Sequence, residues 1–223
     1  EPDIAVVAEA AALFKKGSSA YPDDAAFRNN LGVCQTHTGE DSQALASLRE
    51  AVRLDPSFAE AHYNLGLALR RNHDDEAAVE QFRLARDLKP NEHRYHYNLA
   101  IAESGTHRLD DAARSYAKAA ELAPKYFRAP YNLAILEYRR GNYKEAASWL
   151  ERALAVQPES YAALFNYGLV LLKLDRPADA EAAFRKAIAV EDTVEAEYSL
   201  GLSLSRQDRS SEALDAFRAA LTI

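Results

Sequence analysis

Residues Ala59 to Glu92 read AEAHYNLGLALRRNHDDEAAVEQFRLARDLKPNE, and this stretch decides the fold. Small and apolar residues recur in each half at the three-and-four spacing of an amphipathic helix, at Leu65, Gly66 and Leu69 and then at Ala78, Phe82 and Ala85. Between the halves, Asn72 to Asp75 offers turn and N-cap residues, and Pro90 closes the second half. The stretch therefore predicts a helical hairpin.

The same pattern recurs along the chain with a period of thirty-four residues. The eighth position of the unit is always small, at Gly32, Gly66, Ala100, Ala134, Gly168 and Gly201. The twentieth is always alanine, at Ala44, Ala78, Ala112, Ala146, Ala180 and Ala213. The twenty-seventh is alanine too, at Ala51, Ala85, Ala119, Ala153, Ala187 and Ala220. Since one hairpin cannot bury both of its faces, this repetition predicts stacked hairpins whose backbones cross closely at the small residues.

Large side chains accompany the small ones in each second helix, at Leu48, Phe82, Tyr116, Leu150, Phe184 and Phe217. Prolines end four of the units, at Pro56, Pro90, Pro124 and Pro158. Together with the Leu-Gly or Leu-Ala pair of each first helix, these residues make a pattern that resembles the tetratricopeptide repeat family. The resemblance implies an all-α fold, a right-handed superhelical solenoid of stacked antiparallel helical hairpins, and it covers nearly the whole chain.

We expect one solenoid domain over residues 1–223, because no linker or low-complexity segment divides it. A half repeat at 1–24 precedes six repeats at 25–58, 59–92, 93–126, 127–160, 161–193 and 194–223. Two helices from each repeat and one from the half repeat, spanning Ile4 to Tyr21, make thirteen helices. Gly17 stands where the later repeats have the twenty-seventh-position alanine, and it is expected to weaken that first helix.

Composition limits the classes of partner. The 27 basic and 34 acidic residues give a net charge of −7, which argues against general nucleic-acid or anionic-membrane binding. No apolar run approaches the roughly twenty residues that span a bilayer. The lone Cys34 excludes an intramolecular disulfide and leaves the compartment open, cytoplasmic or periplasmic. The absence of Met and the opening Glu1-Pro2 predict a processed chain or a piece of a longer one.

A row of asparagines is the first candidate binding feature. The sixth position of five consecutive repeats is Asn30, Asn64, Asn98, Asn132 and Asn166. The resemblance places this position on the concave surface formed by the first helices. Each side-chain amide is able to donate to a backbone carbonyl and to accept from a backbone N–H, which suits grip on an extended peptide. The row is similar to the asparagine ladder in the repeat region of O-linked N-acetylglucosamine transferases; the alternative is that asparagine serves the fold at this position.

Aromatic and apolar rows run beside the asparagines. The candidate contacts are Tyr63, Tyr97, Tyr131 and Phe165 at the fifth position and Leu67, Ile101 and Ile135 at the ninth. Such rows on a concave surface predict a binding trough, unless the side chains pack against neighbouring helices instead. Basic residues are expected at its rim, with Arg94 and Arg128 at the second position as candidate contacts. The expected partner is a protein or peptide with apolar anchors and acidic flanks.

The family's clamp for the C-terminal carboxylate of heat-shock chaperones requires Lys at the fifth position and Asn at the ninth. This chain has aromatic and aliphatic residues there, so that partner is disfavoured.

Motifs for catalysis were sought and not found in the sequence: it has no phosphate-binding glycine loop, nucleophile elbow or metalloprotease motif. We therefore predict no enzymatic activity, no cofactor and no metal. His62 and His96 fall at a helix-packing position, and Cys34 is expected to be buried and inert. Glu103 and Glu137 share the eleventh position and are expected to join a polar network with nearby Tyr or Arg side chains.

The sequence thus predicts a protein-interaction scaffold that holds an extended peptide in its groove. One alternative is the substrate-recruiting region of a larger enzyme such as a glycosyltransferase. Another is a self-assembling structural protein, similar to repeat proteins of bacterial organelle or envelope assembly. For the latter we expect weak self-association through an apolar edge at the C-terminal end, formed by Ala213, Leu214, Phe217 and Leu221.

Overall fold

The computed structural model describes residues 4–223, and within them it contains thirteen helices and no strand. The helices are α1 (Ile4–Ala20), α2 (Ala25–Thr38), α3 (Asp41–Leu54), α4 (Ala59–Arg71), α5 (Asp75–Leu88), α6 (His93–Gly105), α7 (Leu109–Leu122), α8 (Arg128–Arg139), α9 (Tyr143–Val156), α10 (Tyr161–Lys173), α11 (Pro177–Val190), α12 (Val194–Ser205) and α13 (Ser210–Ala220). The predicted all-α array of helical hairpins is confirmed. No helix of the described residues is long and apolar enough to cross a membrane.

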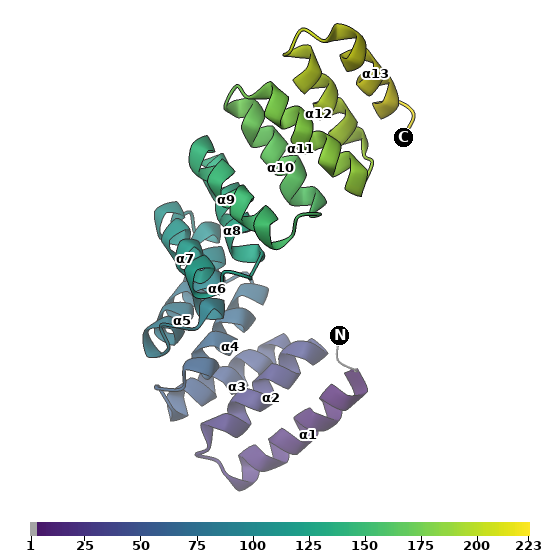
Figure 1. Ribbon diagram of the computed structural model, residues 1–223. Coiled ribbons are helices and arrows are strands. Elements are labelled where there is room, and N and C mark those ends of the chain that lie inside the picture. Colours follow the sequence, from purple (N-terminus) through teal and green to yellow (C-terminus); the bar gives the residue numbers. More distant parts are fainter. Residues whose placement is uncertain (1–3) are drawn as a thin grey trace. The chain divides into compact units, whose positions relative to one another are not determined.

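The helices form two compact units, Glu1–Leu122 with α1 to α7 and Ala123–Ile223 with α8 to α13. Inside each unit, consecutive helices run antiparallel and lie side by side (Figure 1). Each first helix also lies beside the first helix of the next hairpin, as α4 lies between α2 and α6 and α10 between α8 and α12. The first helices therefore line up within a unit, and their equivalent side chains come to lie in rows.

The hairpin of residues 59–92 shows how the local sequence forms the unit. Its first helix ends at Arg71, and His73 has a left-handed backbone with φ of 61°. The Asp74 carboxylate then accepts a hydrogen bond from the Ala77 N–H at 3.2 Å, which caps the second helix. The predicted turn and N-cap between the halves are therefore confirmed.

Small residues set the separation of the two helices in a hairpin. A Cβ atom added at Gly66 would lie 2.6 Å from the ring of Phe82, which is fully buried. The same conflict, with the large residue of the second helix, recurs at Gly32, Gly168 and Gly201. The twentieth and twenty-seventh alanines are all buried as well. Close packing at these positions supplies the apolar burial that stabilises each hairpin.

Gly17 in α1 has a packing role that the sequence did not indicate. A Cβ atom there would lie 2.3 Å from the Phe27 ring of α2. The glycine therefore permits close contact between α1 and α2, whatever helix propensity it costs.

The repeat of residues 161–193 is one residue shorter than the four repeats before it, and Thr193 closes it. Its hydroxyl accepts from the Ala196 N–H at 3.2 Å and lies 2.6 Å from the Tyr161 hydroxyl. The side chain thus caps α12 and ties it to the start of α10, in place of a proline-containing turn.

Candidate peptide-binding surface

The predicted asparagines lie on the first helices, three in the first unit and two in the second, and all five are half-buried; together we call them the asparagine row. The amides of Asn64, Asn98 and Asn166 each donate a hydrogen bond to a residue of the preceding repeat, thirty-five positions earlier in the chain. Asn98 Nδ2 donates to the Tyr63 hydroxyl at 3.0 Å in the first unit, and Asn166 Nδ2 donates to the Tyr131 hydroxyl at 3.1 Å in the second. Fifth-position tyrosine and sixth-position asparagine therefore tie neighbouring first helices together.

The first repeat follows the same rule with a different residue. Asn29 stands at the fifth position in place of tyrosine, and its Oδ1 accepts a hydrogen bond from Asn64 Nδ2 at 2.9 Å. Asn29 is buried, and its own Nδ2 donates to Asn30 Oδ1 at 3.1 Å. An acceptor at the fifth position is thus the shared requirement, and both residue types meet it.

The side-chain amides of Asn98 and Asn166 use both of their N–H donors within the protein. Asn98 Nδ2 also donates to the Arg94 carbonyl at 2.9 Å, and Asn166 Nδ2 donates to the Ala162 carbonyl at 2.7 Å. Within the described residues, neither Oδ1 accepts a hydrogen bond. The orientation of each amide is therefore held by the protein, and one acceptor oxygen remains for a ligand. These hydrogen bonds between repeats were not predicted from the sequence, although each asparagine stands thirty-five residues after the fifth-position residue that it contacts.

The aromatic row contributes to the fold as well. The Tyr63 ring lies 5.8 Å from that of Phe82, and the Phe165 ring lies at the same distance from that of Phe184. Tyr97 pairs with Tyr116 in the same way and is buried, so it offers a ligand little surface. Tyr63, Tyr131 and Phe165 are half-buried and keep part of each ring accessible. Burial raises the pKa of the Tyr131 phenol, which therefore remains protonated.

The ninth-position residues Leu67, Ile101 and Ile135 are half-buried, so part of each side chain reaches solvent. Leu67 packs with Tyr63 against the buried core of the first unit. The packing interpretation therefore holds for Tyr63 and Leu67, while a binding trough formed by these rows stays a prediction.

Basic side chains at the ends of the first helices, including Arg94 of the expected rim, are mostly engaged by the protein itself. The Arg94 guanidinium lies over the Tyr63 ring at 5.8 Å and donates to Glu92 at 3.1 Å. Arg71 donates to the Thr36 carbonyl at 3.0 Å, and Arg206 to the Leu172 carbonyl at 2.8 Å, so each caps the end of the preceding first helix. Arg128, by contrast, is exposed at the start of α8.

The two packing histidines lie where the sequence indicated. His62 and His96 are buried, and each ring Nε2 hydrogen-bonds the carbonyl of a proline that ends the preceding repeat, at Pro56 and Pro90. Burial lowers the pKa of His96, which favours its neutral form. Cys34 is buried, and burial raises the pKa of its thiol, which keeps it in the unreactive protonated form.

The buried carboxylates form the expected polar network with arginine. Glu103 is 1% exposed; it accepts from Arg83 Nη2 at 3.1 Å and from the Ser115 hydroxyl at 2.8 Å. In the second unit, Glu137 accepts from Arg140 Nη1 at 2.8 Å and from Asn142 Nδ2 at 2.6 Å. Both carboxylates are therefore satisfied and join helices of the fold.

Family models match most of the chain. A model described as TPR repeat matches residues 36–73, and models described as Tetratricopeptide repeat match residues 59–92, 126–191 and 171–223. No curated protein matches the chain significantly.

Solved structures share the fold at low sequence identity. A tetratricopeptide protein with an unusual peptide-binding site, YrrB, has a TM-score of 0.74 at 22% identity, covering 82% of this chain and 95% of its own. MamA from Desulfovibrio magneticus has a TM-score of 0.67 at 21% identity, with 74% and 93% covered. The C-terminal part of a repeat protein from Cytophaga hutchinsonii has a TM-score of 0.82 at 16% identity, with 97% and 90% covered. At these identities the likeness concerns the fold alone.

Proposed function

Because the chain belongs to the tetratricopeptide repeat family, whose fold is typically a non-catalytic protein-interaction scaffold, we propose that its first helices hold an extended peptide segment of a partner protein. The observation that carries this proposal is the fixed orientation of the asparagine row. Asn98 and Asn166 have both donors engaged by the protein, and each has an acceptor oxygen available. A peptide backbone supplies N–H donors at regular intervals, and these can donate to the asparagine Oδ1 acceptors.

Side chains beside the row support apolar anchoring of the same segment. In the first unit, Tyr63, Leu67 and Ile101 are half-buried on neighbouring first helices. A single peptide hydrogen bond contributes roughly 0.5 to 1.5 kcal/mol net, so the acceptors alone would bind weakly. We therefore assign the greater part of the affinity to apolar side chains of the peptide and the alignment of its backbone to the asparagines.

The test separates the role of Asn98 in binding from its role in the fold. Peptides would be selected against the chain from a phage-displayed random library, and one of them titrated with Asn98→Ala and with Tyr63→Phe. Tyr63→Phe removes the hydroxyl that Asn98 contacts and keeps the ring and the amide. Asn98→Ala should weaken binding by about three- to tenfold, the value of one lost hydrogen bond, and Tyr63→Phe by clearly less.

Thermal unfolding of both variants completes the experiment. Both should lose about 0.5 to 1.5 kcal/mol of stability for the shared bond between repeats, and Asn98→Ala should lose somewhat more because it also loses its bond to the Arg94 carbonyl. If Asn98→Ala loses stability and binds the selected peptide as the parent does, the asparagine row belongs to the fold alone and the proposal is wrong.

We also propose weak self-association through α13, at a surface smaller than the sequence indicated. Ala213 is buried at 3% exposure and Phe217 is half-buried, so neither forms an exposed edge. The prediction was wrong for these two residues because both pack against α12, where Phe217 contacts Tyr198 at 5.5 Å between ring centroids. Leu214 and Leu221 are exposed and remain as the apolar contact.

A further inference from the structure

A basic cavity of about 520 Å³ lies in the first unit, between α5, α6 and α7. Four basic side chains line it, Arg83 and Arg86 from α5 and Arg114 and Lys118 from α7. The cavity is lined mainly by second helices, so it is separate from the asparagine row, and its chemistry is independent of peptide binding by the first helices.

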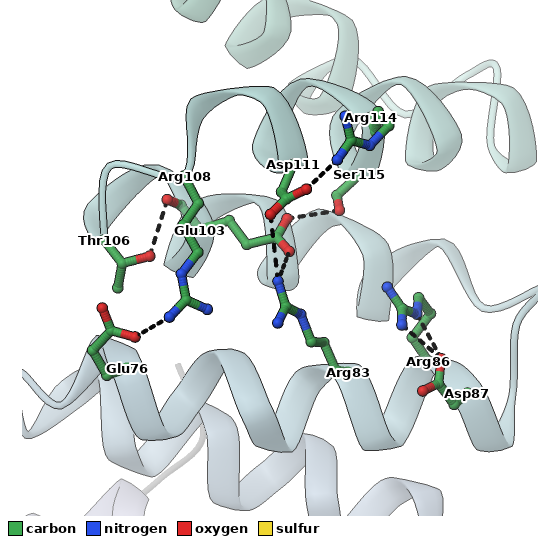
Figure 2. Close-up of polar contacts among 10 residues, drawn as sticks. All are labelled: Glu76, Arg83, Arg86, Asp87, Glu103, Thr106, Arg108, Asp111, Arg114 and Ser115. Atoms are coloured by element: carbon green, nitrogen blue, oxygen red, sulfur yellow. Dashed lines mark hydrogen bonds and ion pairs between the residues drawn. The ribbon is translucent and has the colours of Figure 1, made fainter.

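One carboxylate holds the inner end of the cavity. Glu103 is almost fully buried, and Arg83 contacts one of its oxygens while Ser115 contacts the other. Figure 2 shows Arg83 reaching from α5 toward Glu103 and Asp111 on the facing helices. Leaving the buried Glu103 carboxylate without a cationic partner would strongly lower the free energy of unfolding. Arg83 is therefore held in place whether or not a ligand is present.

The remaining basic groups have partners that are far less buried than Glu103, half-buried for Asp111 and exposed for the other two. Arg114 pairs with Asp111 within α7, and the Arg114 side chain is 73% exposed. Arg86 pairs with Asp87 and Lys118 with Glu121, and these two carboxylates point to solvent with exposures of 62% and 60%. Exposed ion pairs contribute little free energy, so a ligand can replace them at small cost.

The charges in the lining do not cancel. Within the lining, four basic side chains face the two carboxylates Glu103 and Asp111, which leaves an excess of two positive charges. The carboxylates of Asp87 and Glu121, which pair with Arg86 and Lys118, lie outside the lining and point to solvent. A phosphoryl group carries about −1.5 to −2 charges at neutral pH, and the forked guanidinium of arginine binds it through paired hydrogen bonds. The cavity volume also leaves room for residues on either side of such a group.

From this charge complementarity we propose that the cavity binds a phosphorylated side chain of a partner protein. Arg83 forms the fixed floor of the site, and Arg86, Arg114 and Lys118 close on the phosphoryl oxygens from the two second helices. The site adds a second contact surface to the scaffold, on residues that the first-helix rows do not include.

The experiment titrates the full chain with a capped Gly-Gly-phosphoserine-Gly-Gly peptide and follows the backbone amides by NMR. We expect saturable shifts concentrated in α5 and α7. Arg86→Gln/Lys118→Gln should weaken binding by at least about tenfold, because two charge-assisted contacts to the phosphoryl oxygens are lost. Arg49→Gln/Lys186→Gln removes the same charge from exposed positions on other second helices and should change the affinity less than about twofold.

Two further probes decide the chemistry. The matching peptide with glutamate in place of phosphoserine, and inorganic phosphate, should each bind at least about tenfold more weakly than the phosphopeptide. Equal binding of the glutamate peptide would instead indicate an acidic segment, and equal binding of inorganic phosphate a site for a small anion. Either result overturns the proposal, as does an absence of saturable shifts or equal weakening by both double variants. Arg114→Gln, at an exposed residue, repeats the test if Arg86→Gln/Lys118→Gln melts below the parent.

Discussion

Residues at the eighth position of each repeat control how closely the two helices of a hairpin approach. Gly66 faces the ring of Phe82, and Gly168 faces that of Phe184, with no room for a Cβ atom in either place. In the repeat of residues 127–160, Ala134 takes the place of the glycine and Leu150 that of the phenylalanine, and both are fully buried. In the repeat of residues 93–126, Ala100 and Tyr116 hold the same two positions and are buried as well, so the eighth position admits glycine or alanine, and the large side chain packs around the one that is present.

Gly66→Ala is predicted to lower the free energy of unfolding by about 1 to 3 kcal/mol, because the added methyl overlaps the Phe82 ring. The matched control is Gly105→Ala at the end of α6, where the new methyl would meet only the Asp75 carboxylate. That change should be neutral or raise stability by up to about 1 kcal/mol, since alanine favours the helix. Urea unfolding of both variants measures the difference.

A double variant tests the cause. Phe82→Leu should cost less stability when Gly66→Ala is present than when it is made alone, because the smaller side chain relieves the overlap. If Gly66→Ala unfolds at the same urea concentration as the parent, the glycine does not limit the approach of the helices.

At the scale of elements, the turn inside each hairpin has one backbone conformation in all six repeats. The fifteenth position has positive φ throughout, at Gly39, His73, His107, Gly141, Asp175 and Asp208, with values between 55° and 80°. This left-handed residue ends the first helix and turns the chain toward the second. Only two of the six positions are glycine, the residue that adopts this conformation without steric cost.

His73→Gly is predicted to raise the free energy of unfolding by about 0.5 to 1 kcal/mol, because glycine removes the steric cost of a positive φ. Gly141→Ala should lower it by about 1 kcal/mol, and packing has no part in that loss because nothing lies within 4 Å of the added Cβ atom. Thermal and urea unfolding of the two variants should therefore move in opposite directions. A stabilising Gly141→Ala would contradict this account of the turn.

At the scale of the whole molecule, the described chain is two compact units that share one repeat pattern. The division falls between Leu122 and Ala123, while the predicted single domain spans residues 1–223. The helices on either side of that point keep the same small and large residues, so the repeat pattern has no break there. Whether the two units unfold together is thus separate from the repeat pattern, and the single domain remains a prediction.

Self-association is also a property of the whole molecule. Leu214 is 51% exposed on α13 and Leu221 is 87% exposed just beyond it, so Leu214→Glu/Leu221→Glu should remove the apolar contact and lower the apparent mass at high concentration. Leu84→Glu/Leu88→Glu makes the same charge change at two exposed leucines of α5 and should leave the mass unchanged. Sedimentation at rising concentration measures both; a parent protein that stays monomeric throughout would end the proposal.

The hairpins, their number and the residues at which their helices meet could be predicted from the sequence alone. This was possible because helical periodicity is local, and because six copies of one unit repeat every packing requirement at a known spacing. The turn residues and the caps were equally local, so Asp74 was found at its helix start.

The roles of the polar side chains became clear only from the packing of the helices. Asn98 was expected to offer a peptide both a donor and an acceptor, but its donors are used by Tyr63 and Arg94, which a neighbouring helix and the preceding turn bring within 3.0 Å. The basic cavity was not indicated at all, because Arg83 and Lys118 come from different repeats at different positions of the unit. A repeated pattern reports what every copy needs for packing, whereas hydrogen bonds and charges depend on which unlike residues the stacking brings together.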